Sequence, residues 1–183
     1  MATDILTTLE FDRVRENLQR HCQFSLSVER AGELGPSSDP TRVRYLLDVT
    51  GEAYMLIEAY PAFGVRGARD IRRHLQRAEL GGMLQPTDLL EALDMITASR
   101  TTRRTFLRME DAVERFPSID EFVSFIVELP DLEAELQRSI SERGEVLDTA
   151  SEALRKIRQE LRSAHARLIE RVTRYIQGSQ YSA

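Results

Sequence analysis

Three histidines and one cysteine are the side chains of this sequence that most often do chemistry. His21, His74 and His165 lie far apart along the chain, and none has a cysteine or carboxylate at the spacing of a metal-ligand set. His21 and Cys22 are adjacent, but neighbours in a helix point to different faces, so we interpret them as a packed thiol beside a half-exposed imidazole. We therefore expect no catalytic residue, no cofactor-binding residue and no metal site in this chain.

Two glycine-bearing stretches, residues 63–67 and 81–83, lie next to expected helix starts, where backbone amides can bind an anion. Both lack the lysine and the Ser or Thr of a Walker nucleotide-binding loop, and neither follows an expected strand. We interpret both stretches as turns.

Arginines spaced by four residues form two runs that could neutralise phosphates along a helix face. The runs are Arg69, Arg73 and Arg77, followed by Arg100, Arg104 and Arg108. In the alternative interpretation, which we favour, both are solvated faces whose arginines pair with acidic neighbours such as Asp70, Glu79, Asp94 and Glu110.

The most basic segment comes last. Residues 151–177 hold seven basic and three acidic residues in a chain whose net charge is −5. An acidic block precedes it, because residues 109–152 hold thirteen acidic and three basic residues. A segregated basic stripe binds phosphate even on an acidic protein, so we expect weak nucleic-acid binding without sequence preference. The candidate nucleic-acid contacts are Arg155, Lys156, Arg158, Arg162, Arg167, Arg171 and Arg174.

The same segment predicts one long helix with a narrow apolar seam. Apolar residues alternate at spacings of four and three, as in a coiled coil, at Leu154, Ile157, Leu161, Ala164 and Leu168. Thr149 and Glu152 have the spacing of a capping box, which places the helix start at Thr149. The helix would be about 40 Å long. Its seam is buried only against a partner, so we expect pairing with a second copy or packing back on the rest of the chain.

The remaining sequence predicts an all-α helical bundle. Residues 8–34 and 40–57 indicate two long antiparallel helices, the second capped by Asp39 with Pro40 at its first position. Ile140 and Val146 flank a glycine-bearing loop, which indicates at most one short β-hairpin. Further helices are predicted over residues 70–78, 85–116, 119–129 and 132–138. The expected organisation is a core at 1–138, a hairpin or linker at 139–148, the long helix at 149–177 and a frayed tail at 178–183.

Composition restricts the class of protein. The chain has 183 residues, 42% of them apolar and 30% charged, as expected for a globular protein with many exposed helix faces. A single cysteine excludes an internal disulfide framework and suits a cytoplasmic protein. No apolar run approaches the length of a membrane span, and the amino terminus lacks the basic cluster of a signal peptide.

Three stretches resemble the MutS-II family, the bacterial MutS paralogues that lack the mismatch-reading domains. They are LEFDRV at residues 9–14, FGVRGARDI at 63–71 with QRAELGGML at 76–84, and GEVLDTASEALRKIR at 144–158. The resemblance runs nearly end to end. It implies that the chain is the non-catalytic amino-terminal core, followed by the ascending arm of a lever that ends in a clamp around nucleic acid.

In that family a descending arm, an ATPase domain and commonly a carboxy-terminal Smr endonuclease domain follow. The resemblance therefore implies ATP and Mg²⁺ for those later parts and a homodimer for the full-length protein. Implied partners are branched or non-specific DNA, in the restraint of recombination, and stalled ribosomes with their rRNA. The alternative is a self-contained helical module that dimerises through its last helix. A third hypothesis, that the chain is a free-standing enzyme, is supported by no set of residues in the sequence.

Overall fold

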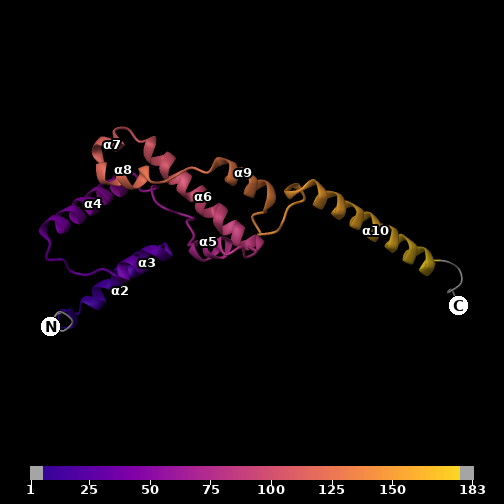
Figure 1. The fold of residues 1–183 in the computed structure, drawn as a ribbon, viewed down its shortest axis with the longest axis horizontal. Coiled ribbons are helices and arrows are strands. Elements are labelled where there is room, and N and C mark those ends of the chain that lie inside the picture. Colours follow the sequence, from indigo (N-terminus) through magenta and orange to yellow (C-terminus); the bar gives the residue numbers. More distant parts are fainter. Residues whose placement is uncertain (1–5, 178–183) are drawn as a thin grey trace.

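The computed structural model describes residues 6–177, which form α-helices joined by loops, one 3-10 turn and one isolated β-bridge. The all-α class is thereby confirmed. The bridge joins Ile140 and Val146, the two residues expected to flank a short hairpin. The last helix, α10 (Glu152–Gln177), projects away from the other helices, so the molecule is elongated (Figure 1). The tail predicted at 178–183 lies outside the described residues.

The first long helix predicted, over residues 8–34, is wrong. The chain forms α2 (Phe11–His21) and α3 (Ser25–Gly32) instead, because Cys22 adopts an extended backbone with φ −78° and ψ 130°. The two helices are antiparallel: Gln19 Nε2 donates to the Val28 carbonyl over 3.0 Å, and Arg15 Nε donates to the Leu34 carbonyl over 2.6 Å. Apolar spacing continues across this turn, so periodicity alone does not reveal it.

The helix α4 (Pro40–Ala59) begins as predicted. An Asp39 carboxylate oxygen accepts from the amides of Thr41 and Arg42, and Pro40 occupies the first position. The helix packs against α8 (Pro117–Ser124), not against the first segment. At that contact Glu52 accepts from the Ser118 amide and hydroxyl, each over 2.7 Å, and so satisfies amides at the start of α8.

The middle of the chain contains shorter helices than predicted. Helix α5 (Arg72–Glu79) ends before Gly81, whose φ of 71° favours glycine. The helix expected over 85–116 is α6 (Pro86–Leu107) followed by α7 (Ala112–Arg115), because Asp111 takes a left-handed φ of 54°. The one expected over 119–129 is α8, which ends at Ser124. Helix α9 (Pro130–Ser139) follows.

One small apolar core joins α4, α6, α7 and α8. Phe106 and Leu56 are 0% and 1% exposed, and the Phe106 ring lies 6.2 Å from that of Phe63. The buried members of this core are Leu56, Phe106, Ala112, Phe116 and Val123.

The apolar seam of α10 does not share this core. Ile157, Leu161 and Leu168 are 62%, 67% and 61% exposed. Packing of the seam back on the other helices, one of the two expectations, is therefore not what the structure has.

Candidate nucleic-acid interface

The start of α10 is set by Ser151, and the capping box predicted from Thr149 is wrong. Ser151 has the extended backbone of an N-cap residue, and its hydroxyl accepts from the Leu154 amide over 3.1 Å. The Thr149 hydroxyl instead donates to the Arg138 carbonyl over 2.5 Å, and Arg138 Nη1 donates back to the Thr149 carbonyl over 3.0 Å. This pair of bonds ties the segment before α10 to the end of α9.

Asp148 draws two of the candidate phosphate contacts toward that segment. Its carboxylate lies 2.7 Å from Arg158 Nη1 and 3.2 Å from Arg162 Nη1. Arg158 also donates to the Val146 carbonyl over 2.8 Å. The hydrogen bonds from Arg158 and then Arg162 lower the pKa of Asp148. Both guanidinium groups are therefore already paired with a carboxylate of the protein itself, that of Asp148.

Elsewhere on α10 the ion pairs are longer or more exposed. Lys156 Nζ lies 3.4 Å from Glu152, and Arg155 lies 4.0 Å from the same carboxylate. Arg174 lies 2.8 Å from Glu170, with both side chains largely exposed. Exposed pairs one helix turn apart contribute only about 0.3–0.5 kcal/mol, so a stronger anion can displace them.

Arg167 and Arg171 have no ion-pair partner within the part of the chain that the structure describes. They line a shallow groove of α10 together with Arg174 and Tyr175. Lys156 and Arg167 line a second groove on the same helix. Of the seven predicted contacts, these two arginines are the ones most available to an incoming phosphate.

Four of the six arginines in the two earlier runs are ion-paired, as the favoured interpretation predicts, whereas Arg73 and Arg108 have no ion pair among the described residues. From the first run, Arg69 lies 3.5 Å from Asp94 and Arg77 lies 3.0 Å from Asp88. Beside it, Arg72 lies 2.8 Å from Asp70 and 2.6 Å from Glu29, and its hydrogen bonds lower the pKa of Asp70 to about 2.

The second run pairs with carboxylates that sequence reasoning did not select. Arg100 donates to Glu133 over 2.7 Å, and that side chain is only 7% exposed, so the pair joins α6 to α9. Arg104 pairs with Glu128 over 2.6 Å. Between them, Arg103 donates to the carbonyls of Val123 and Ile126 and satisfies the end of α8. These partners are distant in sequence, so spacing could not have identified them.

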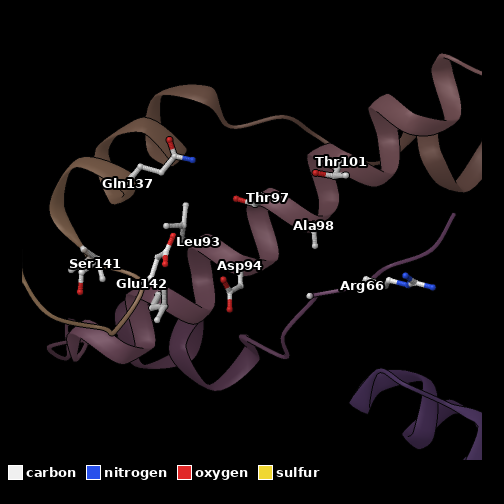
Figure 2. A pocket seen from close by; sticks show the side chains of 12 residues that line it. Arg66, Leu93, Asp94, Thr97, Ala98, Thr101, Gln137, Ser141 and Glu142 are labelled. Atoms are coloured by element: carbon white, nitrogen blue, oxygen red, sulfur yellow. The ribbon is translucent and has the colours of Figure 1, made fainter. Parts of the chain in front are cut away.

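A hollow of about 530 Å³ lies between α6, α9 and the loop that holds Arg66 (Figure 2). Leu93 and Ala98 form part of its wall, and Asp94 and Glu142 place two carboxylates there. Arg66 is the single basic residue that lines this hollow beside these two carboxylates, so its lining is net negative and we place no nucleic-acid contact there.

Side chains that could hold a metal do not cluster anywhere in residues 6–177. His74 Nε2 lies 2.7 Å from Glu91, and its Nδ1 lies 3.5 Å from Asp88. Cys22 Sγ donates to the Leu18 carbonyl over 3.4 Å. Across the described residues, every helix is too short or too polar to cross a membrane.

Comparison with known proteins finds similarity along nearly the whole chain. Over 176 residues, 96% of the chain, it is 47% identical to a protein of Thermomicrobium roseum named Endonuclease MutS2. Proteins with the same name from Geobacillus thermodenitrificans and Bacillus cereus are 37% and 35% identical over 94% and 91% of the chain. The chain spans only 22%, 22% and 21% of the lengths of these three relatives. No family model matches the sequence.

Proposed function

The chain belongs to the MutS2 family, and from this premise we propose that it is the non-catalytic core and lever segment of a nucleic-acid-binding protein. The relatives are named endonucleases, and the chain matches about a fifth of their length. We assign the nuclease activity in that name, together with ATP and Mg²⁺ binding, to other parts of such a longer protein.

The observation on which this proposal rests is the arrangement of α10. The helix projects away from the other helices (Figure 1), on a junction tied at Arg138 and Asp148. On it, Arg167 and Arg171 have no ion-pair partner in the described structure. A long basic helix held at one end is suited to reach along a polyanion. The chain outside α10 is net acidic, which limits the non-specific attraction of nucleic acid to it.

In the full-length protein we propose that this segment contributes to binding branched or recombining DNA, and rRNA of stalled ribosomes, as part of a homodimer. The segment itself supplies contacts to phosphates and no base-specific contacts. Phosphate contacts position a protein on its target without selecting sequence. Discrimination between these targets would therefore depend on other parts of the protein.

Titration of labelled duplex DNA with the chain at two ionic strengths tests the proposal. We expect weak binding without sequence preference that collapses between low and physiological salt, because a basic helix must compete with a net charge of −5. A scrambled duplex of equal length is the control. Tight binding that resists salt, or no binding at low salt, would contradict the proposal.

A second candidate function is self-association through α10, as a helical interaction module. The exposed seam of Ile157, Leu161 and Leu168 favours it. Burying one leucine or isoleucine contributes about 1.5–3 kcal/mol, so covering several of them would stabilise a pair of helices. This candidate is compatible with nucleic-acid binding, because the basic residues flank the seam and do not lie in it.

A further inference from the structure

The basic residues of α10 lie on two flanks of its apolar seam. At 3.6 residues per turn, Lys156, Arg167 and Arg174 follow one another along one side of the seam, and Arg171 lies close to them. Arg158 and Arg162 lie on the other side. Arg155 lies beside Arg162 but, in the described structure, pairs only with Glu152, over 4.0 Å, and belongs to neither set. We call the first set the outer flank and the second set the junction flank.

The junction flank is committed to the segment that precedes α10. Arg158 and Arg162 share the carboxylate of Asp148, and Arg158 also binds the Val146 carbonyl. Freeing both guanidinium groups for a phosphate would break three contacts and leave Asp148 unpaired beside the bound polyanion. The unpaired Asp148 carboxylate would then repel the phosphates and oppose binding.

The outer flank also holds two carboxylates, because Glu160 and Glu170 line its grooves, but in the described structure only Glu170 is ion-paired there, with Arg174. Arg167 and Arg171 have no ion-pair partner among residues 6–177, and the pairs of Lys156 and Arg174 are local and exposed. We infer that α10 contacts phosphate through its outer flank alone, while Arg158 and Arg162 serve to hold the helix on its junction. This inference rests on the proposed nucleic-acid binding and names the surface that performs it.

A double-stranded DNA backbone is the partner that suits this flank. From Lys156 to Arg174 the helix spans about 27 Å, less than the 34 Å of one duplex turn, so a straight flank can reach phosphates within one turn of the duplex. Single strands are bound on platforms of several aromatic side chains. The outer flank offers no such series, since Tyr175 is the only aromatic residue between Glu152 and Gln177.

Two double variants with equal charge change test the assignment. Arg167→Gln with Arg171→Gln changes the outer flank, and Arg158→Gln with Arg162→Gln changes the junction flank. Each phosphate contact adds about 0.9 to the slope of log affinity against log salt. The outer variant should therefore reduce the affinity lost between about 50 and about 200 mM salt by about tenfold, since two contacts are gone. The junction variant should leave the slope of the native chain unchanged.

Asp148→Asn supplies an independent measurement that does not depend on the junction variant remaining folded. It frees Arg158 and Arg162, so duplex binding should become more salt-dependent than in the native chain. Glu145→Gln removes the same charge from the same segment without an ion pair in the described structure, and it serves as the matched control.

The outcomes separate this inference from the proposed function. If the native chain binds no duplex at low salt, the proposed function fails. If it binds but the two double variants lose equal salt dependence, or if Asp148→Asn behaves as Glu145→Gln does, the outer flank is not the contact surface. Preference for single-stranded DNA over duplex would also overturn the inference, whereas equal binding of duplex RNA would support it, because the contact is to phosphates.

Discussion

At the scale of single residues, Phe106 is the most deeply buried member of the small core, at 0% exposure. Its side chain is fully buried in the small core, and it meets α4, α7 and α8 from α6. Phe106→Ala should destabilise the fold by about 3–5 kcal/mol, because a cavity remains in a core with few other members. Urea unfolding followed by circular dichroism measures the loss. Phe125→Ala, at a side chain 76% exposed, is the control and should change stability by less than about 0.5 kcal/mol.

A second prediction concerns the acidic residues beside Arg72. Its hydrogen bonds hold the pKa of Asp70 at about 2, below the ordinary 3.8, and also lower the pKa of Glu29. A lowered folded-state pKa contributes stability above the unfolded value, and this contribution disappears as the pH falls through the folded value. Asp70→Asn should therefore unfold more readily than the native chain at pH 5 and equally near pH 2. Thermal melts across this range decide it, and a constant difference would contradict the assignment.

Residue types predicted a helix start correctly where the stabilising contacts come from neighbouring residues. Asp39 and Pro40 fixed the start of α4, because a cap needs only its neighbours. Glu52 and Arg103 satisfy helix ends 66 and 20 residues away, so no local pattern identified them. For the same reason the capping box predicted at Thr149 was wrong: its hydroxyl donates to the Arg138 carbonyl of α9 and does not cap α10.

At the scale of elements, the seam of α10 gives the clearest test. If it pairs between copies, the native chain should show a mass that rises with concentration in sedimentation velocity. Ile157→Asp with Leu161→Asp should yield a folded monomer, since the core of Leu56 and Phe106 lies elsewhere. Gln159→Asp with Ser163→Asp places the same two charges away from the seam and should leave association intact.

Two results would contradict self-pairing through α10. A native chain that stays monomeric at high concentration would exclude it directly. A seam variant that unfolds throughout would show that the seam packs on the other helices in solution.

Helix type was easier to predict than helix length. Apolar periodicity indicated helices throughout, and the all-α class followed from it. The breaks at Cys22 and Asp111 carry no glycine or proline. The chain bends at Cys22 because α2 and α3 pack against each other, and at Asp111 because α7 packs against α8 and α6. The helix at α10 was predictable from its seam of spacing three and four, which needs no tertiary contact to be recognised, but its start was not, because Ser151 and not Thr149 caps it.

At the scale of the whole molecule, charge is distributed unevenly between body and projecting helix. The predicted candidate contacts all lie on α10, but the sequence could not divide them into two flanks, because Asp148 reaches Arg158 and Arg162 only through the bend before the helix. Carboxylates of the body pair with Arg77, Arg100 and Arg104 of α5 and α6, whereas Arg167 and Arg171 of α10 have no ion-pair partner among the described residues.

Because α10 is held only near its start, a small rotation at its base would displace its far end by a larger distance. A helix of 26 residues is about 39 Å long, and its attachment to α9 is confined to a few bonds around Arg138, Thr149 and Asp148. A tilt of about ten degrees at that pivot would sweep the far end through about 7 Å, roughly the rise of two base pairs. A small shift between α6 and α9, where Arg100 pairs with Glu133, would thus move the far end of α10 far enough to change which phosphates it reaches in the proposed complex.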